Sequence, residues 1–165
     1  MTQINIIGNI LGMSGYDSHT RNLANALNKL TNVRLSTQLI PNWERMVSDR
    51  ELDMIKRKPV DDEINLIITS PVFWKINCGK RNFAFLVWEG DRVPKDFIEY
   101  CLNPDIEKIL VPSEHTKKAI INTYTGGYYP EDNRMLDKEP WITNKIVVIP
   151  HGVNLDLFYP KEKDI

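Results

Sequence analysis

Short apolar runs alternate along this chain with stretches of helical periodicity. The predicted strands are, in chain order, Gln3–Ile7, Val33–Leu39, Ile64–Thr69, Phe83–Trp88, Lys108–Pro112 and Ile146–Ile149. Between them, the spacing predicts helices over about Ser18–Leu30, Trp43–Arg57, Pro94–Cys101 and Ser113–Tyr124. Strands that alternate with helices and are joined by short loops are typical of a doubly wound α/β architecture with a mostly parallel sheet.

The third and fourth apolar runs are nearly continuous rather than alternating. This pattern is typical of parallel strands that helices cover on both faces. Ligands of such sheets bind at the carboxyl ends of the strands. The sequence therefore predicts a binding site in the loops that follow Ile7, Thr69, Trp88 and Pro112.

Length and charge narrow the class of protein. The 165 residues fit one domain, and 21 Lys+Arg against 22 Asp+Glu give a formal net charge of −1, which does not favour nucleic acid as a partner. No run of about 18 apolar residues and no signal segment is present. We therefore expect a cytoplasmic protein, with peripheral membrane association left open.

Cysteine and histidine usage gives no metal-ligand pattern. Cys78 and Cys101 stand apart, so reduced packing cysteines are favoured, although a single disulfide remains open. His19, His115 and His151 are scattered, and no motif with metal-ligand spacing occurs. No metal site is expected.

A glycine-rich segment, Gly8–Tyr16, connects the first strand to its helix and includes Gly12, Ser14 and Gly15. Glycines allow close backbone approach, and a helix start offers free N–H groups to an anion. The spacing matches neither the Walker loop nor the dinucleotide-binding fingerprint. A tight turn and a phosphate cradle are both open, with Asp17 or Ser18 as the helix cap.

His19 follows this segment, in what we expect to be the first helical turn. A capping or solvated histidine is the default interpretation. A ring N–H donor beside a bound phosphate is the functional alternative.

The second candidate segment, Trp88–Pro94, follows the fourth strand and contains Glu89 and Asp91. Carboxylates at a strand's carboxyl end are costly unless they are solvated, paired or functional. A structural role, in which Asp91 caps a helix and pairs with Arg92, explains the presence of Asp91 but not that of Glu89. Glu89-Gly90-Asp91 also has the spacing of a metal-binding pair of carboxylates.

Ser113 begins the third candidate segment. We expect it to cap the next helix, with a ligand contact as the alternative. His115, in the first turn of that helix, is expected to face solvent.

Four segments in this order resemble the N-terminal half of the family 4 glycosyltransferases, which are retaining enzymes of the GT-B fold. The segments are the glycine-rich loop with Asn22–Leu27, then Val87–Pro94, Val111–Glu114, and Ile149–Asn154 with Phe158 and Pro160. The resemblance covers most of the chain. It implies a three-layer Rossmann-like domain that forms one of two facing halves.

The resemblance also implies a division of labour. Residues 1–150 would be the acceptor-side domain, and 151–165 would begin the linker to a C-terminal domain that binds the nucleotide sugar and is absent from this sequence. Gly15 and Tyr16 would lie against the donor diphosphate, and Glu89 or Asp91 would contact the transferred sugar. Catalysis in this architecture needs no metal, so the nucleotide sugar is a co-substrate and no cofactor is implied.

Three hypotheses follow for function. The first is the acceptor-side part of a retaining, hexosyltransferase-type enzyme, inactive by itself, with an unknown sugar, lipid-linked sugar or protein acceptor. The second is a self-contained, non-enzymatic module that binds an anion at the glycine loop. The third is a metal-dependent transferase that uses Glu89 and Asp91. Under the first hypothesis, the uncovered cleft face around Trp88, Phe158 and Tyr159 is expected to cause self-association.

Overall fold

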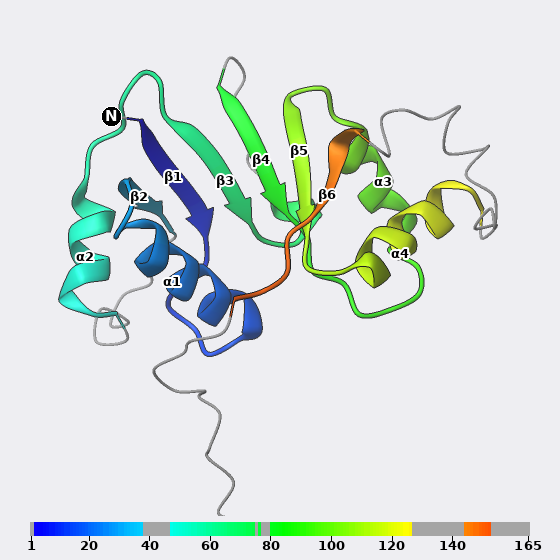
Figure 1. The fold of residues 1–165 in the computed structure, drawn as a ribbon, viewed down its shortest axis with the longest axis horizontal. Coiled ribbons are helices and arrows are strands. Elements are labelled where there is room, and N and C mark those ends of the chain that lie inside the picture. The colour runs from blue at the N-terminus through cyan, green and yellow to red at the C-terminus, as the bar shows by residue number, and fades with distance from the viewer. Residues whose placement is uncertain (1, 38–46, 75, 77–79, 127–143, 153–165) are drawn as a thin grey trace, which may run out of the picture.

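The structure of the protein is a computed structural model that describes residues 2–37, 47–74, 76, 80–126 and 144–152. Within these residues, one six-stranded sheet has the order β2-β1-β3-β4-β5-β6, and every neighbouring pair is parallel (Figure 1). The strands are β1 (Gln3–Gly8), β2 (Asn32–Ser36), β3 (Ile64–Ile68), β4 (Arg81–Phe85), β5 (Ile106–Val111) and β6 (Ile146–Val148). The expected parallel α/β fold is confirmed.

Helices lie on both faces of the sheet and make it a three-layer, Rossmann-like domain. The helices are α1 (Gly15–Leu27), α2 (Asp49–Lys56), α3 (Lys95–Leu102) and α4 (Glu114–Tyr124), with a 3-10 turn η2 at Pro71–Phe73 that the sequence did not predict. Helices α1 and α2 pack in one apolar cluster with Ile6, Leu35 and Phe85, while α3 and α4 pack with Ala84 and Ile109 on the other side.

The start of α1 corrects a sequence expectation. The helix begins at Gly15 rather than Ser18, because Ser14 caps it by accepting a hydrogen bond from the backbone of Asp17. The Asp17 carboxylate in turn accepts from the Ser14 amide, which completes a capping box. At the other end, α1 stops at Leu27, so Leu30 is 81% exposed instead of belonging to the apolar stripe.

The other helix boundaries follow from similar caps. Ser48 and Glu51 form a second capping box at the start of α2. Ser113 caps α4 by accepting from the Thr116 amide at 3.2 Å, as expected. Pro94 precedes α3 without a side-chain cap, so the expected capping of this helix by Asp91 is wrong, and none of the ion pairs found among the described residues joins Asp91 to Arg92.

A row of buried asparagines crosses the sheet on one face. The Nδ2 of Asn5 donates to Oδ1 of Asn65 at 2.8 Å, and the Nδ2 of Asn65 donates to Oδ1 of Asn82 at 3.0 Å. Asn82 donates to the backbone carbonyls of Lys80 and Asp105, and Ser36 donates to Asn5. Since each amide is placed by its neighbour, this row couples β1, β3 and β4 in one register.

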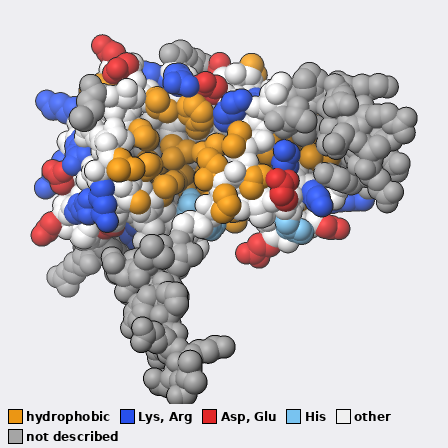
Figure 2. Space-filling view, viewed as in Figure 1, with side chains coloured by type: hydrophobic (Ala, Val, Ile, Leu, Met, Phe, Trp, Pro, Cys, Tyr) orange, Lys and Arg blue, Asp and Glu red, His pale blue; other side chains and the backbone are white. Residues whose placement is uncertain are grey.

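One face of the sheet keeps hydrophobic side chains at the surface. Ile4, Phe83 and Leu110, on the α1 and α2 side, are only partly buried, and Val147 is 36% exposed. Figure 2 shows hydrophobic side chains gathered across the middle of the molecule in this view. Helices α1 and α2 cover β1 and β2 more completely than the strands beyond them.

Several sequence expectations lie outside the described residues. They concern Trp43, Cys78, the linker after Gly152 with Phe158 and Tyr159, and residues 127–143 of the polar stretch Gly126–Asn144, which its Pro, Asp and Asn content predicts to be a surface loop. Cys101 is described, and it is a buried free thiol whose pKa burial raises to about 12. It is a packing residue, as expected.

Candidate functional site

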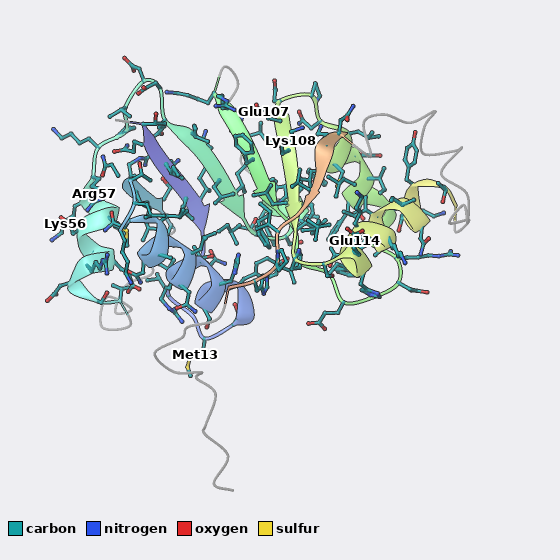
Figure 3. All side chains as sticks on the ribbon, viewed as in Figure 1. Met13, Lys56, Arg57, Glu107, Lys108 and Glu114 are labelled. Carbon is teal, nitrogen blue, oxygen red and sulfur yellow. The ribbon has the colours of Figure 1, made fainter. Side chains whose placement is uncertain are left out.

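The carboxyl ends of the strands converge on one edge of the sheet, beside the first turns of α1. In the order β2-β1-β3, the strand that follows β1 in the chain lies on one side of it and β3 lies on the other, so the direction of strand addition reverses at β1. Open α/β sheets bind ligands at such a reversal point. Exposed Met13 marks this edge in Figure 3, whereas Glu107 lies toward the opposite end of the sheet.

A hollow of about 960 Å³ opens at this edge, and we call it the α1 groove. Its lining consists of Gly15, Tyr16, His19, Asn22, Leu23, Asn25, Ala26 and Lys29 from α1 and the residues after it, Arg50 from α2, and Val87, Glu89, His151 and Gly152 from the segments after β4 and β6. A smaller hollow of about 460 Å³ adjoins it on the other side of Tyr16 and Glu89. The glycine loop and the end of β4 therefore share one site.

The first half of the glycine loop is a closed turn. The Asp17 carboxylate accepts hydrogen bonds from the amides of Gly12 at 2.8 Å and Ser14 at 3.2 Å, and from the Ser14 hydroxyl. A Cβ on Gly12 would lie 2.8 Å from an Asp17 oxygen. Arg21 holds the loop from the other side by donating to the carbonyl oxygens of Ile10 and Gly12. These contacts favour the turn interpretation for Gly12 and Ser14.

Asp17 is held in its charged form by this turn. Its side chain is almost fully buried, and burial by itself raises the pKa of a carboxyl. The hydrogen bonds from Ser14 and Gly12 and the nearby charge of Arg21 outweigh burial, so the pKa of Asp17 lies below its usual value. The carboxylate therefore stabilises the loop and the helix start at neutral pH.

The second half of the loop is open. Gly15 and Tyr16 are the first two residues of α1, so their amides precede the first intrahelical bond, which Ser18 donates to Ser14. A Cβ on Gly15 would meet no atom within 4 Å. The two residues that carry these N–H groups, at the positive end of the helix dipole, thus line the α1 groove.

Three consecutive carbonyl groups after β4 are held by side chains from two helices. Tyr16 donates its hydroxyl to Val87 at 3.1 Å, and Thr116 donates to Trp88 at 3.1 Å. The Nε2 of exposed His115 lies 3.1 Å from the carbonyl oxygen of Glu89. Burial raises the pKa of Tyr16 more than the bond to Val87 lowers it, which keeps the hydroxyl a donor. The backbone that carries Glu89 is therefore fixed.

The two candidate carboxylates differ in position. Glu89 is exposed and lines both hollows, whereas Asp91 lines neither. The backbone carbonyl of Asp91 accepts from Asn122 at 3.0 Å, which places this residue toward α4. Ser113 also lines neither hollow, and its hydroxyl serves the N-terminus of α4. Among the predicted residues, the structure brings Gly15, Tyr16, His19 and Glu89 together.

The sequence suggested that His19 is a capping or solvated side chain, and the structure shows that it is neither. It lies in the second turn of α1, half-buried, with its ring 4.6 Å from Phe85 and stacked 4.5 Å from His151. Its Nε2 atom is buried and has no partner among the described residues. Burial, and then the neighbouring charge of His151, lower the pKa of His19 below its usual value.

We expect this environment to make stability depend on pH. A histidine whose folded-state pKa is lowered contributes stability that is present above the unfolded pKa of about 6.5 and is lost as pH falls through the folded pKa. The free energy of unfolding should therefore decline between pH 7 and pH 5, and less so in a His19→Phe variant. Urea denaturation at both pH values measures this.

The control for this experiment is His115→Gln, which changes an exposed histidine. That variant should keep the pH dependence of the unmodified chain. An equal decline in the His19→Phe variant would show that His19 is not the titrating group.

Sequence analysis did not name five further polar residues of the lining as site residues, namely Asn22, Asn25, Lys29, Arg50 and His151. Those on α1 continue a helical stripe from Gly15 through His19, so their spacing held a readable signal. Arg50 and His151 reach the groove only through the tertiary fold.

Within the described part of the chain, no group of three or more His, Cys, Asp or Glu side chains is arranged to hold a metal ion. The described helices are all too short or too polar to cross a membrane. Comparisons with protein family models, curated proteins and solved structures find no match to this chain. Function must therefore be argued from the groove itself.

Proposed function

We propose that this chain is the acceptor-side domain of a retaining glycosyltransferase that uses a nucleotide sugar, and that it also supplies part of the donor phosphate site. One observation carries the proposal: Gly15 and Tyr16, whose amides begin α1, and Glu89, which has an exposed side chain, line the same groove. A leaving diphosphate needs donors that stabilise growing negative charge. A sugar that becomes positively charged needs a carboxylate nearby.

The roles follow from this arrangement. The amides of Gly15 and Tyr16 would stabilise the departing nucleotide, and Glu89 would face the transferred sugar and the acceptor hydroxyl. Tyr16, Thr116 and His115 act as positioning residues, because they hold the backbone carbonyls of Glu89 and of the two residues before it. In this proposal a second domain binds the rest of the nucleotide sugar, and the reaction needs no metal.

The proposal is tested by removing one N–H group without disturbing the helix. Gly15→Pro deletes the amide at the first helical position, where proline fits, and Ser14 already has the extended backbone (ψ 164°) that a following proline requires. Gly15→Ala keeps the amide and adds a Cβ in open space. The two variants thus differ in one hydrogen-bond donor.

We expect UDP-glucose to shift the NMR amide signals of Tyr16 and its neighbours with a weak dissociation constant, in the region of about 1 mM. Gly15→Pro should abolish these shifts and Gly15→Ala should retain them. The absence of any shift near α1 in the unmodified chain would contradict the proposal.

The self-contained anion-binding module is the second candidate, and the open amides of Gly15 and Tyr16 also favour it. The same titration separates the two. Micromolar affinity for UDP would indicate a site that is complete in this chain, because half of a shared site cannot provide so many contacts.

A further inference from the structure

The α1 groove continues well beyond the residues that the proposed chemistry uses. Its lining follows α1 from Gly15 to Lys29, just past the end of the helix. Fourteen helical steps correspond to about 20 Å. The groove is therefore long enough to hold a molecule of several rings, with one end at Glu89 and the other at Lys29 and Arg50.

The far end of the groove is positively charged. Lys29 follows α1 and Arg50 lies in the first turn of α2, and both are exposed. Glu89, at the near end, is the carboxylate among the lining residues. The far end therefore offers two cations, and none of the lining residues there is an acid that could neutralise them.

Most other arginines in the described part of the chain have partners. Arg34, Arg57 and Arg81 form ion pairs with carboxylates, and Arg21 donates to backbone carbonyls. Arg50 and Lys29 have no side-chain hydrogen bond or ion pair among the described residues.

Two acids flank Arg50 in sequence: Asp49 is exposed and does not line the groove, whereas Glu51 is already engaged. It is 5% exposed, and its two carboxylate oxygens accept from Nδ2 of Asn25 at 2.9 Å and from the amide of Ser48 at 2.8 Å. The bond from Asn25 also joins α1 to α2, the helices that carry Lys29 and Arg50 to the lining of one groove. Among the described residues, neither cation has an ion-pair partner.

The middle of the groove is mixed in character. Leu23, Ala26 and Val87 provide apolar surface, and the side-chain amides of Asn22 and Asn25 line it as well. Apolar patches and amides together suit the faces and hydroxyl groups of a sugar. A guanidinium and an ammonium group together suit a phosphate, which accepts several charge-assisted hydrogen bonds.

We propose that the ligand of the α1 groove, and hence the acceptor, carries a phosphate group that Lys29 and Arg50 bind, at the opposite end from the hydroxyl that faces Glu89. The naming of this ligand as the acceptor rests on the proposed function, whereas the phosphate site itself does not. The phosphate can belong to a soluble sugar phosphate or to the headgroup of a lipid-linked one.

The test uses the 165-residue chain with glucose 6-phosphate as the soluble probe and glucose as its neutral counterpart. Calorimetry should detect binding of glucose 6-phosphate, and the double variant Lys29→Gln/Arg50→Gln should weaken it at least about tenfold, since each charged hydrogen bond contributes substantially. The matched control, Lys58→Gln/Lys95→Gln, removes two exposed lysines outside the groove and should bind as the unmodified chain does.

A second arm identifies the source of the phosphate. Sedimentation with phosphatidylglycerol vesicles, compared with phosphatidylcholine vesicles, shows whether the chain binds a lipid phosphate at the same residues. Binding to either probe that depends on Lys29 and Arg50 supports the proposal. Binding to neither probe, or binding that the double variant leaves unchanged, overturns it.

The UDP-glucose titration separates this proposal from the proposed function. If glucose 6-phosphate binds through Lys29 and Arg50 but UDP-glucose shifts no signal near α1, the phosphate site stands and the transferase does not. If UDP-glucose binds at α1 while neither glucose 6-phosphate nor phosphatidylglycerol vesicles bind, the transferase stands and its acceptor lacks this phosphate.

Discussion

Asn65→Asp should lower the free energy of unfolding at pH 7 by about 3 to 5 kcal/mol, because it leaves an unpaired charge in the sheet. Asn65 is fully buried, between a donor on Asn5 and an acceptor on Asn82. A carboxylate can accept from Asn5, but it repels the Oδ1 atom of Asn82 and has no cation beside it.

The same variant should recover stability as the pH falls. A protonated carboxyl can accept from Asn5 and donate to Asn82, so it reproduces the native pair of hydrogen bonds. Burial raises the folded-state pKa of the introduced carboxyl above its unfolded value of about 3.9. Its stabilising contribution is therefore complete below pH 3.9 and is lost as pH rises through the folded pKa.

The measurement is the difference in unfolding free energy between the variant and the unmodified chain at pH 7 and pH 5. The difference is needed because other carboxyls of the protein lose stabilising interactions as the pH falls, which is the opposite of the effect expected at position 65. For Glu63, burial raises the pKa, but hydrogen bonds from Arg34 and Gln3 lower it by more, so the pKa lies below its usual value. The native chain itself therefore loses stability in acid.

Two controls accompany this variant. Asn65→Leu removes, at every pH, the acceptor that Asn65 offers to Nδ2 of Asn5 and the donor that it offers to Oδ1 of Asn82, so its loss should not depend on pH. Asn22→Asp places a carboxylate on the exposed face of α1 and should have little effect. If the destabilisation by Asn65→Asp stayed constant with pH, the row of asparagines would not be the hydrogen-bonded unit that we describe.

Glu89→Gln should reduce sugar transfer by about 10²- to 10³-fold in a protein that joins this domain to its donor-binding partner. The side chain keeps its size and loses only its charge, and the backbone carbonyls around it stay bound to Tyr16, Thr116 and His115. The loss should therefore be in kcat rather than in KM, because the carboxylate acts on charge that develops in the transition state.

Asp91→Asn is the matched control for this substitution. Asp91 is two residues away and also exposed, but it lines neither hollow. Its loss should change transfer less than threefold. Equal losses in the two variants would point instead to the metal-dependent mechanism in which both carboxylates act together, and activation by manganese would then be expected.

The sequence was most informative where physical chemistry is local. Near-continuous apolar runs at β3 and β4 indicated parallel strands covered on both faces; the sheet is parallel, as expected, but Phe83 of β4 is only partly buried on the α1 and α2 side. Ser113 before α4 was readable as a cap because capping involves residues three apart. The start of α1 was also readable, from Ser14 and Asp17, but a later pair of residues was favoured instead.

The candidate site was only half accessible to this kind of reasoning. The rule for parallel sheets indicated the edge at which the α1 groove lies, and the order of the motifs indicated Gly15, Tyr16 and Glu89, which line it. No local pattern shows that the amides of Gly12 and Ser14 are already taken by Asp17, since that depends on the path of the loop. No local pattern shows that Asp91 and Ser113 lie away from the groove either.

Tertiary structure alone decided the long-range contacts. The order of the strands brings His151 against His19, and the packing of α2 on β2, together with its hydrogen bond to α1, brings Arg50 to the groove. The sequence by itself determined which segments are strands and helices, because periodicity and capping act over a few residues. Only the fold decided which of their side chains meet, because such contacts depend on strand order and helix placement, on which local periodicity has no bearing.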